Sequence, residues 1–192
     1  MTSRYQPTVS SSSRLPAPSD HAGDPESLSF ADLGVSQAIV EALESRGIVH
    51  PFPIQALTLP VALRGNDIIG QAKTGTGKTL GFGIPMLEAV AGPGEEGWEE
   101  LPDGAKGKPQ GLVVLPTREL AKQVASDLRA AAKYLSTRIV EIYGGVAFEP
   151  QISALKKGAD VVVGTPGRLI DLLRQGHLHL SGVETVAGWP GL

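Results

Sequence analysis

Cysteine is absent from this chain of 192 residues, so it has no disulfide scaffold and no metal site built on thiolates. No apolar run approaches the roughly 18 residues that a membrane-spanning helix needs, so no membrane contact is predicted. An excess of positive charge is also missing, because 17 Lys and Arg stand against 20 Asp and Glu. The formal net charge of −3 argues against a broad phosphate-binding surface. Backbone amides and a few arginines could still form a narrow one.

Stretches rich in Ser, Pro and Gly divide the chain. Residues 1–27 are rich in Ser and Pro and lack the apolar core of a secretory signal, so we predict a disordered tail. Residues 28–192 then form one domain of ordinary size. Within it, residues 92–110 combine Gly and Pro with acidic residues, which predicts a mobile surface loop. The lack of cysteine agrees with a reducing compartment, and we expect a cytoplasmic protein.

Apolar runs alternate with amphipathic stretches along the ordered part. Strands are expected at 67–70, 111–115, 138–142, 160–164 and 183–187, with helices between them. This alternation favours an α/β fold, in which an open and mostly parallel sheet carries helices on both faces. In such a sheet, ligands bind beyond the carboxyl ends of the strands.

Residues 72–79 read Ala-Lys-Thr-Gly-Thr-Gly-Lys-Thr and stand between an expected strand and an apolar helical stretch. Gly75 and Gly77 let the backbone curl with its N–H groups toward an anion. Lys78 adds a charge for the outer phosphates, and Thr79 offers a hydroxyl to Mg²⁺. A strand, a glycine turn and a helix N-terminus in this order predict a nucleoside triphosphate site. The alternative is a glycine-rich turn without a ligand, and Ala72 departs from the usual pattern, which has Gly there.

Small, hydroxyl and Arg residues follow the next three expected strands. These sets are Pro116–Ala121, Gly144-Gly145 and Thr165–Arg168. Thr117 and Thr165 would stand at helix N-termini, where free amides bind phosphate, while Arg118 and Arg168 add charge and Gly145 permits close approach. Because all three sets lie at one edge, we expect a track for a sugar–phosphate backbone beside the nucleotide site. The arginine at 118 could instead pair with the acidic residue after it, and the threonines could be plain caps.

Together these motifs resemble the DEAD-box RNA helicases of superfamily 2, over residues 30–186. The similar elements are motif I at 72–79, motif Ia at 116–121, the GG element at 144–145, motif Ib at 165–168, and the Q motif at 47–55 with Phe30 upstream. The resemblance implies the N-terminal RecA-like P-loop domain of an ATP-dependent RNA helicase. Such an enzyme binds ATP and the RNA backbone, independently of base sequence, to unwind RNA duplexes.

The resemblance also implies roles for the residues that match. Gln55 would read the adenine edge with its carboxamide. The expected ATP-binding residues are Phe30, Gln55, Thr74, Gly75, Thr76, Gly77, Lys78 and Thr79. Lys78 and Thr79 are the expected catalytic residues, and Thr79 would hold the Mg²⁺ of MgATP. The expected RNA contacts are Thr117, Arg118, Gly145, Thr165 and Arg168. Two positions depart from the family: Ile48 replaces an aromatic residue of many members, and Phe52 replaces Ser or Thr.

An Asp-Glu-Ala-Asp sequence is missing after the last expected strand, where residues 187–192 read Ala-Gly-Trp-Pro-Gly-Leu. In this family those carboxylates hold Mg²⁺ and orient the attacking water, and a second RecA-like domain follows. We therefore expect a truncated domain, incomplete at its C-terminus and catalytically incompetent alone. Two alternatives stay open. One is a nucleotide- or RNA-binding fragment without ATP turnover, and the other is an unrelated P-loop kinase or transporter ATPase, which the Q motif and the Thr–Arg sets disfavour.

Overall fold

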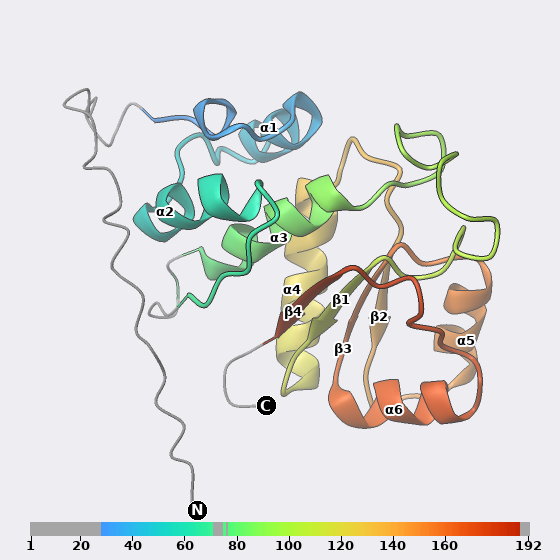
Figure 1. Cartoon of the computed structure of the whole chain (residues 1–192). Helices are drawn as coiled ribbons and strands as arrows, with labels where there is room; N and C mark the ends of the chain where they lie inside the picture. The colour runs from blue at the N-terminus through green and yellow to red at the C-terminus, as the bar shows by residue number, and fades with distance from the viewer. Residues whose placement is uncertain (1–27, 71–74, 76, 189–192) are drawn as a thin grey trace, which may run out of the picture.

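A computed structural model describes residues 28–70, 75 and 77–188 (Figure 1). Its centre is a parallel sheet of four described strands in the order β2-β3-β1-β4. The strands are β1 (Gly111–Val114), β2 (Ile139–Ile142), β3 (Val161–Gly164) and β4 (Thr185–Gly188). In the register of β1 with β3, Val113 lies opposite Val163. The predicted α/β architecture with a mostly parallel sheet is confirmed.

Four helical elements precede β1, and one helix lies between each pair of successive strands. They are η1 (Ala31–Leu33, a 3₁₀ turn), α1 (Gln37–Glu44), α2 (Pro53–Ala62), α3 (Lys78–Ala89), α4 (Arg118–Ala131), α5 (Glu149–Lys156) and α6 (Pro166–Arg174). Pro60 lies inside α2, which continues past it. Pro166 opens α6, the position that a fixed φ favours. Among the described helices, none is long and apolar enough to cross a membrane.

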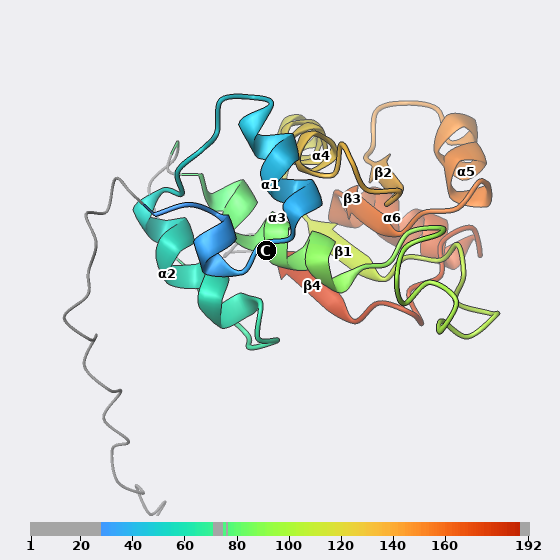
Figure 2. The same cartoon turned by 90° about the horizontal axis from the view of Figure 1, so that it is seen from above.

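Alternate residues of β3 enter two separate cores, which explains why the strand is buried throughout. Val161 and Val163 pack with α1, α3 and α4, whereas Val162 packs with Leu169 and Leu172 of α6. Successive side chains of a strand point to opposite faces of the sheet, so helices must cover both. Figure 2 shows α1, α2 and α3 gathered at one end of the molecule and α5 and α6 at the other.

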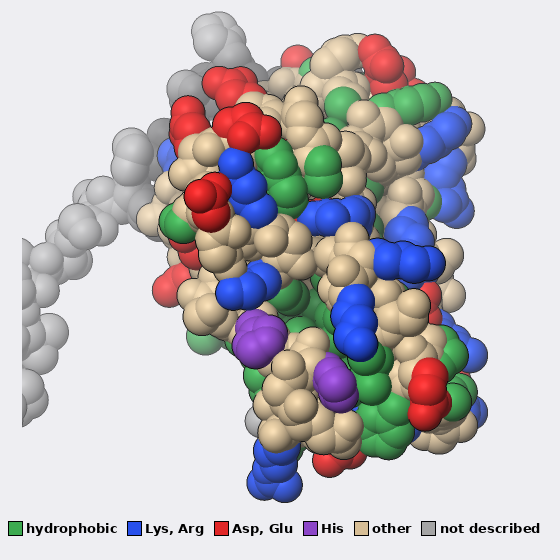
Figure 3. All heavy atoms as spheres, turned by 90° about the vertical axis from the view of Figure 1, so that its right-hand side faces the viewer, with side chains coloured by type: hydrophobic (Ala, Val, Ile, Leu, Met, Phe, Trp, Pro, Cys, Tyr) green, Lys and Arg blue, Asp and Glu red, His purple; other side chains and the backbone are tan. Residues whose placement is uncertain are grey.

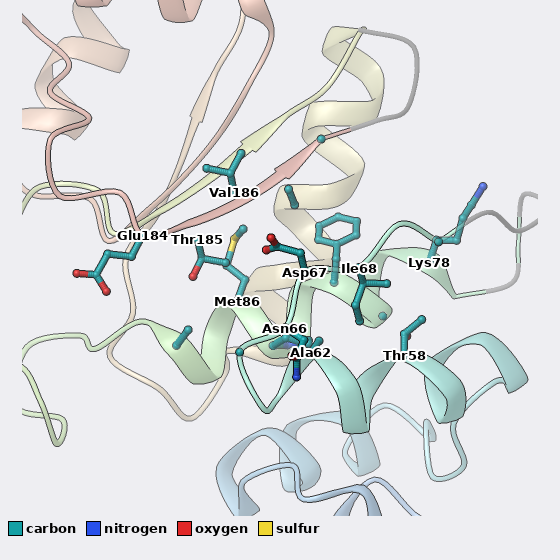
Figure 4. Close-up of a pocket in the computed structure, with 18 of the residues that line it drawn as sticks. Thr58, Ala62, Asn66, Asp67, Ile68, Lys78, Met86, Glu184, Thr185 and Val186 are labelled. Carbon is teal, nitrogen blue, oxygen red and sulfur yellow. The ribbon is translucent and has the colours of Figure 1, made fainter. Parts of the chain in front are cut away.

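One expected strand is wrong. Residues 67–70 form no strand, and Ile69 is 99% exposed. A cavity of about 650 Å³ separates this segment from β4, and Figure 4 shows Asp67 and Ile68 on one side of it and Val186 on the other. A strand needs a hydrogen-bonded neighbour about 4.8 Å away. The segment has no such neighbour among the described residues, so its β-branched residues cannot form a ladder.

The Gly- and Pro-rich segment 92–110 forms a series of turns, and its own side chains attach it to the domain. Glu95 accepts hydrogen bonds from Gly92 N, at 2.6 Å, and from Ser136 N. The Trp98 ring lies 5.2 Å from the Arg138 guanidinium carbon. Mobility of this segment remains a prediction. The disorder predicted for residues 1–27 lies outside the described part of the chain.

Candidate functional site

The carboxyl ends of β1, β2 and β3 meet at one edge of the sheet, because the three strands are parallel neighbours. Backbone pairing continues where the strands end, since Thr165 N donates to the Ile142 carbonyl at 2.9 Å. The three segments that leave this edge carry the two Thr–Arg sets and the glycine pair. The structure therefore brings together the groups that the sequence predicted to share an edge.

Thr117 and Arg118 lie where the chain passes from β1 into α4. The Thr117 hydroxyl accepts a hydrogen bond from Leu120 N at 3.2 Å, so the helix cap is present. Arg118 Nε lies 3.1 Å from Glu119 Oε1, and both side chains are largely exposed. A hydrogen bond from its own backbone amide, and then one from Arg118, lower the pKa of Glu119. Both the cap and the ion pair exist, and both residues remain at the surface.

The turn between β2 and α5 places Gly145 beside Arg118. Gly145 has a φ of +79°, a left-handed conformation that favours glycine. A methyl group at this position would lie 3.2 Å from Arg118 Nη1. Residues 144–147 are exposed. The turn thus presents bare backbone next to a guanidinium, an arrangement suited to a phosphodiester chain.

Gln151 supports this turn from behind, and no sequence motif identified it. Its Oε1 accepts from Tyr143 N at 3.2 Å, and its Nε2 donates to the Tyr143 carbonyl at 3.0 Å. The side chain lies in the first turn of α5 and is buried. A single glutamine in a short helix carries no sequence signal that separates this role from an exposed position.

Arg168 is placed differently from the expected phosphate contact. It is only 8% exposed, and its Nη2 donates to the Val146 carbonyl at 2.8 Å. Its guanidinium carbon lies 3.8 Å from the centroid of the Phe148 ring. The Nη1 atom is buried and has no hydrogen-bond partner among the described residues. Arg168 therefore lies beneath the turn and braces it, while Thr165 ahead of it is half-buried at the sheet edge.

The N-terminus of α3 forms the second part of the site. Gly77 is the N-cap, with a φ of +74°, and among the described residues no side-chain hydrogen bond caps the helix. Lys78 and Thr79 form the first turn, and Figure 4 shows Lys78 extending from the start of α3. The amides of a helix's first turn, together with the helix dipole, attract an anion. Gly75 has a φ of +82° with open space where a side chain would be. Thr74 and Thr76 lie outside the described residues.

Gln55 connects α2 to this turn. The side chain is fully buried, its Oε1 accepts from Phe52 N at 2.9 Å, and its Nε2 donates to the Gly77 carbonyl at 2.8 Å. A methyl group on Gly77 would overlap the Gln55 amide and would lie 2.7 Å from the Phe52 ring. The residue expected to read adenine is therefore bound to the backbone of the glycine turn in this structure.

Phe30 has no surface at the site. It is 1% exposed and packs in the main core with residues such as Ile39 and Leu43. Such a ring offers almost no surface to a ligand in this structure, and its contact with the nucleotide stays a prediction. The aromatic residue near the glycine turn is instead Phe52, which is half-exposed.

A cavity of about 440 Å³ joins the glycine turn to α4. Gly77, Lys78 and Thr79 line it on one side, and Leu120 and Gln123 of α4 line it on another. On the face shown in Figure 3, Lys and Arg side chains are spread across the middle and right of the view, and Asp and Glu side chains gather mainly toward its top. The formal net charge of −3 favours a narrow site made of backbone groups and a few arginines over a broad basic surface.

Comparison with known proteins identifies the relatives of this chain. A family profile described as DEAD/DEAH box helicase matches residues 52–187. DEAD-box ATP-dependent RNA helicase 3B, chloroplastic, from Zea mays is 49% identical over 166 residues, which cover 84% of this chain and 21% of the relative. DEAD-box ATP-dependent RNA helicase CshA from Bacillus cereus is 46% identical over 157 residues, covering 82% of this chain and 28% of the relative. The chain thus spans about a quarter of the length of these relatives.

Solved structures agree with the sequence comparison. A DEAD box protein from the hyperthermophile Methanococcus jannaschii superposes with a TM-score of 0.72 at 36% identity, covering 83% of this chain and 40% of that one. The Saccharomyces cerevisiae protein Dbp5, bound to RNA and ADP BeF3, superposes with a TM-score of 0.68 at 27% identity, covering 83% and 37%. The likeness therefore includes the fold and extends over most of the described residues.

Proposed function

Because the chain belongs to the DEAD/DEAH box helicase family, we propose that it is the ATP- and RNA-binding domain of an ATP-dependent RNA helicase. The observation that carries this proposal is the meeting of the Thr117–Arg118 set, the Gly145 turn and Thr165 at one sheet edge. A cavity beside α4 lies between that helix and the first turn of α3, which Lys78 opens. The chain covers 21% of the Zea mays relative, so RNA unwinding by the whole protein is part of the proposal.

The phosphates of ATP would bind at the N-terminus of α3. The backbone at Gly75 and Gly77, the amides of the first turn and the Lys78 ammonium supply donors and charge for a polyphosphate. The Thr79 hydroxyl would hold Mg²⁺ that arrives on the nucleotide. Among the described residues, no group of three His, Cys, Asp or Glu could hold a metal ion. Mg²⁺ is commonly held by one or two protein groups together with the phosphates of a substrate. Bound MgATP would supply the phosphoryl group, while these residues bind and orient it.

RNA would bind along the edge formed by β1, β2 and β3. The exposed groups there are the amides at the start of α4, the Arg118 guanidinium and the bare backbone of Gly145. Such groups contact phosphate and sugar but carry no information about the bases. We therefore expect RNA binding that is independent of sequence. The oligomeric state does not enter this proposal.

A second candidate function is binding without turnover. No Asp-Glu-Ala-Asp occurs in the sequence, and no cluster of acidic metal ligands lies among the described residues. Phosphoryl transfer to water needs groups that orient the water and balance developing charge. The chain by itself is then proposed to bind ATP and RNA without hydrolysing ATP, and the helicase activity would belong to a longer protein.

One experiment tests both candidates. ATP and ADP binding would be measured by titration calorimetry, RNA binding by fluorescence anisotropy, and phosphate release with and without RNA. We expect nucleotide and RNA binding without RNA-stimulated phosphate release. Release at the rate of a complete helicase would contradict the second candidate. Absence of both ADP and RNA binding in a folded sample would contradict the first, and RNA affinity unresponsive to ATP analogues would favour an unrelated P-loop protein.

The compartment is also a proposal. The absence of cysteine fits a reducing compartment such as the cytoplasm. The Zea mays relative is named chloroplastic. Fractionation of cells that carry a tagged copy would decide the location.

A further inference from the structure

The exposed turn at residues 143–147 has little support from its own backbone. Among the described residues, no backbone–backbone hydrogen bond outside the helices and strands reaches this segment. The strand that leads into it, β2, is an outer strand of the sheet. Two consecutive glycines, Gly144 and Gly145, would adopt many conformations without outside restraint. The defined shape of the turn must therefore come from side chains.

Two buried side chains supply that restraint. The Gln151 carboxamide exchanges two hydrogen bonds with Tyr143, at 3.2 and 3.0 Å, and its Nε2 lies 3.5 Å from the Ala147 carbonyl. It thus acts as the peptide group of a neighbouring strand would act at this free edge. Arg168 fixes the middle of the turn through the Val146 carbonyl at 2.8 Å. Gln151 contacts both ends of the segment, and Arg168 contacts its centre.

We propose that Gln151 is a positioning residue for RNA binding, because it holds the backbone of the turn where Gly145 meets the sugar–phosphate chain. This inference rests on the proposed RNA-binding function. Gln151 is 7% exposed and both ends of its carboxamide are engaged, so it acts through Gly145 and touches no RNA itself. Without it, RNA would have to order a loose glycine turn on binding, and that ordering lowers affinity.

A second glutamine in the chain provides a matched control. Gln110 is also 7% exposed, and its carboxamide also exchanges two hydrogen bonds with one residue, accepting from Ala91 N at 3.1 Å and donating to the Ala91 carbonyl at 2.8 Å. Gln110 immediately precedes β1, at the opposite edge of the sheet from the Gly145 turn. Replacing either glutamine by Met removes the same kind of bonds and keeps a side chain of similar length.

The experiment compares the full chain with its Q151M and Q110M variants. Affinity for a fluorescein-labelled single-stranded oligouridine is measured by anisotropy, affinity for ADP by calorimetry, and stability by thermal unfolding. We expect Gln151→Met to bind the RNA about tenfold more weakly while its ADP affinity is unchanged. Gln110→Met should keep the RNA affinity of the unmodified chain. The melting temperatures of the two variants should fall by similar amounts. Amide exchange should accelerate at 143–147 in Gln151→Met alone.

The outcomes separate this inference from the function on which it rests. RNA binding by the unmodified chain that is equally strong in Gln151→Met would overturn the positioning role and leave the proposed function standing. Equal losses of RNA affinity in both variants would also overturn it, because they would report general destabilisation. No RNA binding by the unmodified, folded chain would overturn the proposed function and this role with it.

Discussion

Gln55 donates a hydrogen bond from Nε2 to the Gly77 carbonyl over 2.8 Å and so joins α2 to the turn that opens α3. The same side chain accepts from Phe52 N, so both ends of its carboxamide are engaged. Under the proposed function, Gln55 can bind the adenine edge only by exchanging its bond to Gly77. We therefore expect nucleotide binding and the contact between α2 and α3 to be coupled through this side chain.

Gly77→Ala is expected to weaken both folding and nucleotide binding. The left-handed φ of +74° disfavours any side chain by about 1–2 kcal/mol, and the new methyl group would also overlap Gln55. Gly65→Ala is the matched control, because Gly65 has a φ of +76° with no atom within 4 Å of the added methyl group. Urea unfolding should show a loss about 1–3 kcal/mol larger for Gly77 than for Gly65, the cost of overpacking. Equal losses would mean that the contact with Gln55 is unimportant.

Lys78→Ala is expected to weaken ATP binding by about 1.5–3 kcal/mol, because it removes a charge-assisted contact with the phosphates. Calorimetric titration with ATP and with tripolyphosphate measures the effect, which should be similar for both ligands. Lys133→Ala, on the surface beside Tyr134, should leave both affinities unchanged. ATP affinity that does not respond to the loss of Lys78 would refute the assignment of the phosphate site.

Arg118→Met is expected to weaken RNA binding alike for all base sequences. The exposed guanidinium beside Gly145 would neutralise about one phosphate, so the slope of log affinity against log salt should become shallower by about 0.7. Anisotropy titrations at several salt concentrations, with oligonucleotides of different composition, measure the slope. Arg129→Met is the control, because Arg129 lies in the last turn of α4, where it pairs with Glu141. A loss for one base sequence only would contradict contact with the backbone.

Asp160→Asn is expected to destabilise the domain without a direct effect on the binding of ATP or RNA. The Asp160 carboxylate is fully buried and accepts from Arg138 N, Nε and Nη2 at 2.7, 2.9 and 2.7 Å. Its hydrogen bond raises the pKa of the Arg138 guanidinium. Since Arg138 is partly exposed, we expect a loss of about 2–3 kcal/mol in the free energy of unfolding.

Glu99→Gln provides the comparison for that ion pair. Glu99 pairs with Lys106 at 2.7 Å on the surface, where such pairs contribute at most about 1 kcal/mol. Urea unfolding of both variants should therefore show a clearly larger loss in the free energy of unfolding for Asp160→Asn than for Glu99→Gln. A similar small change for Asp160→Asn would show that the buried pair contributes little to stability.

Much of the fold could be predicted from the sequence because its signals are local. The apolar runs that predict β1, β2 and β3 lie within one or two residues of the observed strands, and Thr117 and Pro166 mark the helix starts that were expected. The strand prediction for residues 67–70 was wrong for a non-local reason. Their β-branched composition favours a strand, but a strand also needs a neighbour, and a cavity lies where the neighbour would be.

The candidate site was predictable in its chemistry and only partly in its geometry. The glycine turn, the Thr–Arg sets and the glycine pair resemble motifs of the family and occur in its order along the chain. Each motif also follows an apolar run, which predicts its place at the end of a strand. The sequence does not show that Arg168 is buried beneath Phe148 or that Phe30 is enclosed in the core. These placements depend on side chains from distant segments.

The sequence alone predicted the order of the four described strands and of the helices, since periodicity and turn chemistry act over a few residues, and its motifs indicated the family by resemblance. The tertiary structure decided which polar side chains hold the site together. Gln55 meets Gly77 across 22 positions and Arg168 meets Val146 across 22, because packing brings remote segments together to satisfy buried polar groups. A linear pattern cannot indicate such partners, because their selection depends on the whole packed domain.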